Sequence, residues 1–365
     1  MRFVAPKISI CLPTLNSREF LPQRMESILA QTESDWELIV CDSYSNDGTW
    51  EYLQTYRDDH RVRLFQIPAD GLYAGWNQCL ARVRGKYFYF ATSDDTMQPK
   101  LLARLSAALE AQPDVMVATC NFDFIDQKDA VIPPTQGIAG SFLGEWADRP
   151  HRRSGMVDFL IHSEISISWT TMTSALFRRD ILDVIGLFRV DASFSADRFW
   201  AVALSLHSDT VHLPEHLATW RIHDRQSSSL PPPGWRKRNV ELMEETLQNH
   251  WPRVASMLPG LPQEMLMDHL LSGVRRYFEE SFCLDRMHLK RRPRQFITGA
   301  VRSLFGCPGL LWRRLKTGFA WEPEVEDQTR ELMRSWSIPW PPDPIEVTEV
   351  ASDSDRHASK LETKR

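Results

Sequence analysis

Two adjacent carboxylates, Asp94 and Asp95, come directly after an apolar run of the sequence. Such a pair at the end of a strand is costly unless a cation or hydrogen-bond donors neutralise its charge. Oxygen-rich sites suit Mg²⁺ or Mn²⁺, which take further oxygen ligands from phosphates. Taken alone, however, the pair does not distinguish a metal site from a solvated turn.

Two further polar clusters follow apolar runs, at residues 13–16 and 42–49. In the second, Asp42 stands at the strand end and is the better ligand candidate, whereas Asp47 and Thr49 have the spacing of an Asx-type turn that opens a helix. Ligands of parallel α/β sheets gather at the carboxyl ends of the strands. We therefore expect all three clusters at one edge of a sheet.

The elements that would position these residues can be read from the hydrophobic pattern. Short apolar runs alternate with segments of helical spacing, which favours a mainly parallel α/β sheet over a sandwich. Asn16 and Glu19 have the spacing of a capping box, which predicts the start of the first helix. The predicted strands lie over residues 7–16, 36–41, 62–67, 87–91 and 115–124.

The composition is that of a globular protein, with 365 residues of which 42% are hydrophobic, and a net charge of −5. An acidic balance gives no reason to expect a nucleic-acid partner. Six cysteines without metal or redox spacing are expected to be buried, in a reducing compartment. We see no signal peptide and no run near the ~18 apolar residues of a membrane helix, and therefore expect a cytoplasmic protein.

The C-terminal third has a different pattern. The tract 227–234 (SSSLPPPG) predicts a boundary between a domain over 1–229 and a helical region over 235–320. Residues 286–318 hold nine Lys or Arg and no acid, with apolar residues at helical spacing. Such a segment can lie peripherally on the anionic inner face of a membrane, or pack on the protein with a solvated basic face. Residues 321–365 are predicted to be a disordered polar tail.

The ordered set of motifs resembles family 2 glycosyltransferases. The resemblance is close over about residues 7–126 and looser to about 229. It implies a GT-A fold, a nucleotide-diphospho-sugar donor, and Mg²⁺ or Mn²⁺ as cofactor. The motifs are Pro13-Thr14-Leu15-Asn16, Glu37 to Asp42, Asp47-Gly48-Thr49, Gly71-Leu72-Tyr73 with Asn77, Gly85-Lys86-Tyr87 and Ser93-Asp94-Asp95.

Carried over residue by residue, the resemblance implies specific roles. Asp42 would contact the nucleotide base, although Ser43 stands where many members have a second acid. Asp95 and His223 would hold the metal ion that bridges the diphosphate. The remaining donor-site candidates are Pro13, Thr14, Asn16, Asn77, Asp94 and Arg221.

The segment 195–200 resembles the acceptor side of the family site, where Asp197 would be the catalytic base. Inverting transfer needs one carboxylate to take the proton from the attacking hydroxyl, while a metal stabilises the leaving diphosphate. The alternative for Asp197 is an acid favoured by the dipole at a helix start. For Trp169 and Trp200, packing in the core is preferred over stacking on an acceptor sugar.

The leading hypothesis is inverting transfer of a sugar, from a UDP-linked donor, to a hydroxyl of a surface glycan or lipid-linked acceptor. A nucleotidyltransferase could use the same edge carboxylates, and a non-catalytic member could bind the sugar nucleotide alone. The sequence has no P-loop and no G-x-G-x-x-G fingerprint, which argues against a Walker ATPase or a Rossmann dehydrogenase.

Overall fold

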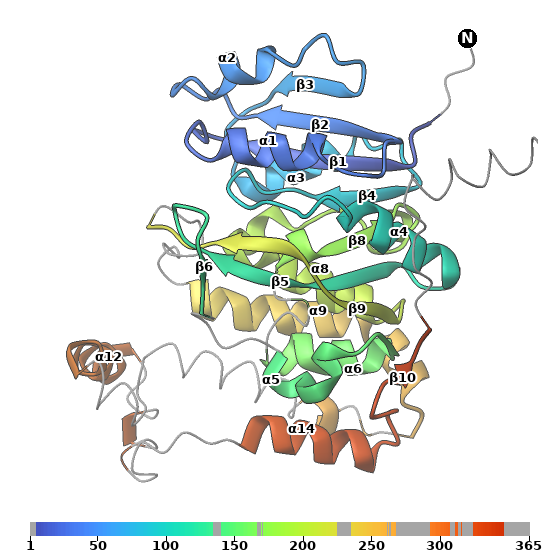
Figure 1. Ribbon diagram of the computed structural model, residues 1–365. Helices are drawn as coiled ribbons and strands as arrows, with labels where there is room; N and C mark the ends of the chain where they lie inside the picture. Colours follow the sequence, from blue (N-terminus) through green and yellow to red (C-terminus); the bar gives the residue numbers. More distant parts are fainter. Residues whose placement is uncertain are drawn as a thin grey trace, which may run out of the picture.

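The protein is built around one mixed β-sheet with helices on both faces (Figure 1). The computed structural model describes residues 5–133, 140–165, 169, 171–224, 235–260, 262, 264–267, 293–306, 311–312, 315 and 324–346. The strands are β1 Ile8–Thr14, β2 Trp36–Asp42, β3 Val62–Gln66, β4 Tyr87–Phe90, β5 Val117–Ile125, β6 Val131–Ile132, β7 His151–Arg153, β8 Ala175–Arg178, β9 Thr210–Arg221 and β10 Asp343–Pro344. The α-helices are α1 Leu21–Leu29, α2 Thr49–Gln54, α3 Leu72–Leu80, α4 Leu101–Ala111, α5 Gly140–Leu143, α6 Gly155–Leu160, α7 Ile181–Ile185, α8 Ala196–Ser205, α9 Trp235–Met257, α12 Pro293–Gly306 and α14 Glu324–Ser335. Shorter helical segments are η1 Gly144–Asp148, η2 Ile161–Ile165, η3 Met172–Ser174 and η4 Val190–Ser195.

The strand order is β10-β7-β9-β5-β8-β4-β1-β2-β3, with β6 paired to β5. Strands β4, β1, β2 and β3 are parallel, as expected, and so are β5 and β9. The whole sheet is mixed because β8 runs antiparallel between β4 and β5, and β7 and β10 are antiparallel at the far edge. In this register Thr14 pairs with Asp42, so the loops after β1 and β2 leave the sheet side by side.

The alternation of side chains along β1 supplies a core on each face of the sheet. Ile8, Ile10 and Leu12 pack with helices α1 and α4 on one face. Cys11 lies on the other face, in the core that also contains residues of α3, α6 and α8. Cys11, Cys41, Cys79 and Cys120 are all buried, as expected for cysteines that act as small hydrophobic residues. Cys283 and Cys307 lie outside the described residues.

Helix α3 approaches strand β1 unusually closely. A Cβ atom added at Gly75 would lie 2.8 Å from the Cβ of Pro13, so only glycine fits at this position without a shift. The close approach places α3 directly beside the carboxyl end of β1. This geometry matters below, because α3 contacts residues on both sides of the candidate site.

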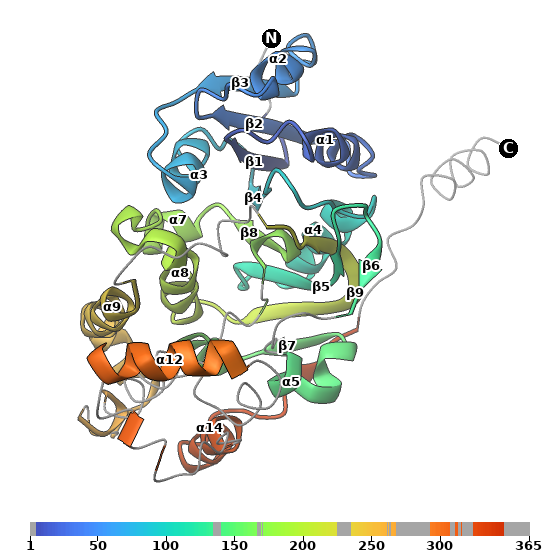
Figure 2. The ribbon, with the colours of Figure 1, turned by 90° about the vertical axis from the view of Figure 1, so that its left-hand side faces the viewer.

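The C-terminal segments continue the fold rather than leave it (Figure 2). Leu242 and Leu247 of α9 are buried in the same core as helix α8. The expectation of a disordered tail from residue 321 is wrong for 324–346: Met333 of α14 is fully buried, and β10 pairs with β7. An amphipathic helix can bury one apolar face while most of its residues are polar. The polar average composition of this segment therefore led to a wrong prediction of disorder.

Other expectations have different outcomes. The Asn16–Glu19 capping box is wrong, because α1 begins at Leu21 and Asn16 binds the neighbouring loop instead. The boundary tract 227–234 and most of the basic segment lie outside the described residues. Within the described ranges, no helix combines the length and apolarity needed to cross a membrane.

Candidate active site

Asn16 joins the loops that follow β1 and β2. Its backbone N–H donates to Ser45 Oγ at 2.9 Å, and its Oδ1 accepts from the N–H of Asn46 at 3.0 Å. Asp47 lies next to these residues and forms the Asx-type turn expected of it, since Oδ1 accepts from the N–H of Thr49 at 3.0 Å; the N-cap of α2 itself is Gly48. The two loops therefore form one rigid rim at the carboxyl edge of the parallel strands, where ligands of such sheets bind.

Asp42 stabilises this rim from inside. It is fully buried, and its Oδ1 accepts from Thr14 Oγ1 at 2.9 Å and from Ser45 Oγ at 2.6 Å. Its Oδ2 accepts from the N–H of Ser45 at 3.0 Å. Both carboxylate oxygens of Asp42 thus accept hydrogen bonds from residues of the rim or next to it. Pro13 and Thr14 are buried, as Asp42 is. The sequence placed these residues correctly at the edge. In the structure Asp42 holds the rim, and its contact with a nucleotide base stays a prediction.

Tyr44 lies at the rim, and sequence reasoning did not name it as a candidate. Its side chain is 64% exposed and its φ is 52°, a left-handed conformation that is unfavourable for a bulky residue. Leu15, on the facing loop, is also exposed. Backbone strain of this kind persists only where the surroundings hold it, and it concentrates at functional sites. The available signal was an aromatic residue inside a tight polar turn that follows a strand.

Asp94 is the acid of the pair that faces solvent. Its side chain is 25% exposed, and its Oδ2 lies 3.0 Å from Nε2 of His223, which follows β9. Burial acts to raise the pKa of Asp94, but the hydrogen bonds from His223 and Thr92, together with the attraction of His223, lower it more, and the net shift of the pKa is downward. The structure thus brings together two predicted site residues that lie 129 positions apart in the chain.

Asp95 points inward. Its Oδ1 accepts from the N–H of Arg221 at 2.8 Å and its Oδ2 from Thr92 Oγ1 at 2.7 Å. Burial, and then the negative charge of Asp94, raise the pKa of Asp95 to about 7. Asp95 therefore anchors the loop after β4 to β9, and its role as a metal ligand stays a prediction.

The phosphate contact of Arg221 stays a prediction, and the structure gives its guanidinium several partners within the protein, including an ion pair. Its side chain is fully buried, and Nε and Nη1 donate to the backbone carbonyls of Asp94 and Asp126 at 2.7 and 2.8 Å. Nη2 pairs with Asp129 Oδ1 at 2.5 Å, and the guanidinium lies 4.8 Å from the ring centre of Phe20. Arg221 thus fixes the backbone that carries Asp94.

Asp197 lies in the first turn of helix α8, which begins at Ala196, and its side chain is partly buried. Its carboxylate accepts a hydrogen bond from the Tyr73 hydroxyl, and its Oδ1 accepts from the N–H of Arg198 at 2.8 Å. Burial raises the pKa of Asp197 to about 6 despite these bonds. A carboxylate with a pKa near the working pH is suited to general-base chemistry.

Helix α3 connects Asp197 with the strand ends. Tyr73 contacts Asp197, and one turn later Trp76 Nε1 donates to the carbonyl of Ala91, just after β4, at 3.4 Å. Asn77 uses Oδ1 and Nδ2 to bind the backbone N–H and carbonyl of Phe188, at 3.0 and 2.9 Å. Asn77 therefore positions the segment that leads to Asp197, and its role in donor binding stays a prediction.

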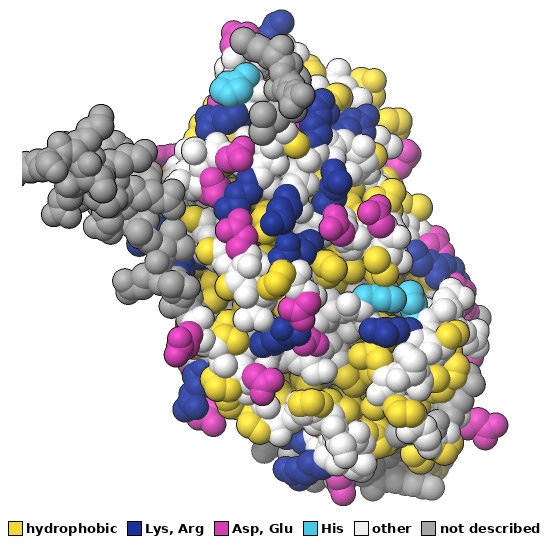
Figure 3. Space-filling view, turned by 90° about the vertical axis from the view of Figure 1, so that its right-hand side faces the viewer, with side chains coloured by type: hydrophobic (Ala, Val, Ile, Leu, Met, Phe, Trp, Pro, Cys, Tyr) yellow, Lys and Arg dark blue, Asp and Glu magenta, His cyan; other side chains and the backbone are white. Residues whose placement is uncertain are grey.

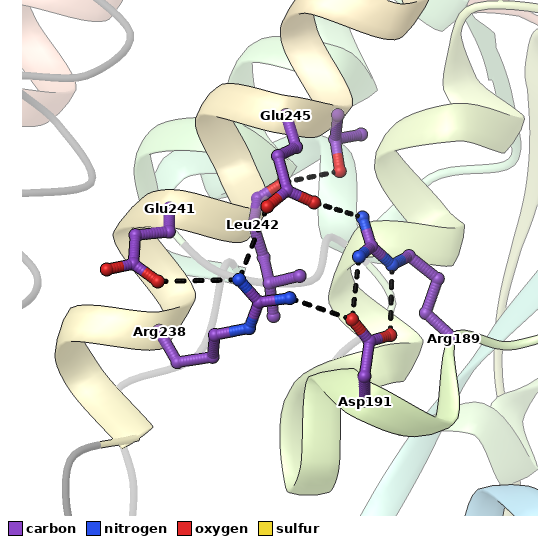
Figure 4. A network of polar contacts seen from close by, with 7 residues as sticks. Arg189, Asp191, Arg238, Glu241, Leu242 and Glu245 are labelled. Carbon is purple, nitrogen blue, oxygen red and sulfur yellow. Dashed lines mark hydrogen bonds and ion pairs between the residues drawn. The ribbon is translucent and has the colours of Figure 1, made fainter.

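An ion-pair network holds the segment before Asp197 against helix α9 (Figure 4). Arg189 donates to Asp191 Oδ2 at 2.7 Å and to Glu245 Oε2 at 2.9 Å. Arg238 donates to the same two acids, at 2.8 and 3.2 Å. Helix α9 thus holds η4 in place, and η4 leads directly into the helix that carries Asp197. Trp169 and Trp200 are buried in the core nearby, as expected.

The match to a protein family covers this edge of the sheet. A model described as "Glycosyl transferase family 2" matches residues 9–186. These residues form a family 2 glycosyltransferase domain. The fold is similar to the crystal structure of S. aureus TarS 1–349 in complex with UDP-GlcNAc. The two structures superpose with a TM-score of 0.59 and 16% sequence identity, over 89% of this chain and 92% of that one. This likeness shows the fold alone, and it confirms the GT-A architecture.

Curated relatives agree with the domain assignment. TuaG of Bacillus subtilis, named as a teichuronic acid biosynthesis glycosyltransferase, is 31% identical over 121 residues, which are 33% of this chain and 46% of the relative. EpsE of the same species, named as a glycosyltransferase, is 35% identical over 29% of this chain and 39% of its own length. The chain thus spans less than half of each of these relatives.

The donor set at the edge fits a divalent metal that shares its coordination with phosphates. Among the described residues no three His, Cys, Asp or Glu side chains form a metal-binding group. Mg²⁺ in phosphate-transfer sites is held by one or two protein carboxylates together with substrate phosphates, rather than by an all-protein cage. The partly exposed carboxylate of Asp94, beside the imidazole of His223, would supply the protein ligands for a site of that kind.

Proposed function

We propose that the protein transfers a sugar, with inversion, from a UDP-linked donor to a hydroxyl group of a surface polysaccharide acceptor. The names of TuaG and of the UDP-GlcNAc complex of TarS support the class of acceptor and donor. The observation that carries the proposal is that helix α3 contacts both parts of the site. Its Tyr73 donates to Asp197, a partly buried carboxylate of α8 with a raised pKa, and its Trp76 contacts the strand end before Asp94.

In this mechanism the rim formed by Asn16 and residues 42–48 receives the nucleotide. The exposed ring of Tyr44 is positioned to stack on the base, and aromatic rings contribute apolar contact area of this kind at binding sites. Asp94 and His223 would hold Mg²⁺ or Mn²⁺, whose charge would stabilise the leaving diphosphate. Arg221 and Asp95 keep the backbone of this loop fixed from behind.

Asp197 takes the proton from the attacking acceptor hydroxyl. Burial raises its affinity for that proton, while the hydrogen bond from Tyr73 orients the carboxylate. A base that accepts a proton must be ionised beforehand, and a pKa of about 6 leaves Asp197 mostly ionised at neutral pH.

The test is incubation of the full chain with UDP-sugars and Mn²⁺, following nucleoside diphosphate release and the anomeric configuration of the product by NMR. Release of UDP with an inverted anomer is expected. Release of pyrophosphate would instead indicate a nucleotidyltransferase, and donor binding without turnover across broad acceptor panels would indicate a non-catalytic binding protein.

A further inference from the structure

Helix α12 carries an apolar stripe that faces away from the protein. Ile297, Val301 and Leu304 are 60%, 51% and 57% exposed. Phe296 and Gly299 are buried, so the opposite side of the helix is the one that packs. Since a helix turns about 100° per residue, the three exposed side chains fall within an arc of about 60°. Two more large apolar side chains, Trp312 and Leu315, are exposed just beyond α12, at 68% and 53%.

This concentration distinguishes the segment from the rest of the surface. Scattered exposed apolar residues are normal, but a contiguous apolar stripe marks an interaction site. Charge adds to the pattern: residues 286–318 hold nine Lys or Arg and no acid, although the whole chain has a net charge of −5. The opposite side of the molecule shows Lys and Arg interspersed with Asp and Glu (Figure 3).

We propose that α12 lies in the surface of an anionic lipid bilayer, with Ile297, Val301 and Leu304 inserted among the acyl chains. An amphipathic helix with apolar residues on one face and basic residues around it binds membranes in this way, through buried apolar area and attraction to anionic headgroups. At 14 residues the helix is about 21 Å long, shorter than the ~30 Å hydrocarbon layer, so it lies on the bilayer instead of spanning it.

The position of α12 relates the proposed membrane contact to the candidate site. In Figure 1 the strands β2, β3 and β5 point toward the side on which α12 lies, and Figure 2, seen from that side, shows α12 across the front of the molecule. Helix α12 and the carboxyl edge that holds the candidate site therefore lie on the same side of the molecule. If the proposed function is right, an acceptor anchored in the bilayer by a lipid would be presented to the site from this side; this last step rests on that function.

The experiment measures binding of the full chain to vesicles by co-sedimentation, without any nucleotide-sugar. Binding to vesicles of phosphatidylcholine with phosphatidylglycerol is expected, with weaker binding to pure phosphatidylcholine and at high salt. The variant I297S/V301S/L304S is expected to lose about tenfold or more in affinity. Substituting Lys290, Arg291 and Arg292 by Gln should remove most of the preference for anionic vesicles.

A matched control is V131S/V184S, which removes apolar side chains that are 70% and 54% exposed elsewhere on the surface. It should bind vesicles as the parent does. No binding to anionic vesicles, or equal loss in the control, overturns the proposal. So does a concentration-dependent dimer in sedimentation velocity that the triple variant abolishes, because a second copy would then cover the stripe. Donor turnover without vesicles tests the proposed function separately, so that either proposal can fail alone.

Discussion

Replacing Asp197 by Asn is expected to make the protein inactive and more stable at once. Burial raises the pKa of Asp197 from 3.8 to about 6. A rise of about 2 units corresponds to a cost of about 3 kcal/mol for keeping the ionised carboxylate in the fold. An amide oxygen can still accept the hydrogen bonds of Tyr73 and Arg198. We therefore expect Asp197→Asn to gain about 1–3 kcal/mol in the free energy of unfolding at pH 8.

The sign of the pH dependence follows from the direction of the shift. Because the folded-state pKa of Asp197 is raised, its burial costs nothing below pH 4, where the acid is protonated in both states. The cost develops as pH rises from about 4 to 6 and is complete above that. Urea unfolding of parent and variant should therefore diverge at pH 8 and coincide near pH 4.

Activity gives the second readout. Loss of a general base should lower kcat by about 10²- to 10⁴-fold, and kcat/KM of the parent should fall about tenfold per pH unit below pH 6. Asp191 is the control with the opposite pKa shift, because the hydrogen bond from Arg189 lowers the pKa of Asp191 to about 2. The variant Asp191→Asn should therefore lose stability at neutral pH. If Asp197 were merely a helix N-terminal acid, the Asn variant would keep its kcat and lose stability. That result would refute the reasoning.

Further predictions concern the rim, the metal site, the brace and the tail. Tyr44→Gly should weaken donor binding in calorimetry by roughly 0.5–1.5 kcal/mol through loss of the ring, without loss of stability because glycine relieves the positive φ; unchanged affinity would exclude stacking. Asp94→Asn should remove the stimulation of donor turnover by Mn²⁺, whereas a variant stimulated as the parent is would show that Asp94 is not a metal ligand. Arg238→Met should raise the KM for acceptor with little change in stability, since exposed ion pairs are screened by solvent and contribute little; an unaltered KM in steady-state kinetics would mean that the network does not position Asp197. Met333→Ala should lower the free energy of unfolding by about 2–5 kcal/mol in urea titrations, and a loss below about 0.5 kcal/mol would contradict the packing of α14.

The sequence by itself determined the parallel strands, the edge at which the acids gather and the residue types available for chemistry. Apolar runs followed by polar clusters are local signals, and they placed Asp42, Asp94 and Asp95 correctly at the ends of β2 and after β4. The ordered motifs also led to the glycosyltransferase family, which the family model over residues 9–186 confirms.

Only the tertiary structure decided which of these polar groups face a ligand and which face the protein. Arg221 and Asp42 carry ligand-binding chemistry in sequence, yet both are fully buried and bound by partners from other elements. The exposure of Tyr44 and the order of α14 likewise depend on contacts between distant parts of the chain. A local pattern fixes what a side chain can donate or accept, but its partners are chosen by packing, because burial forces each polar group to be satisfied by whichever element lies beside it.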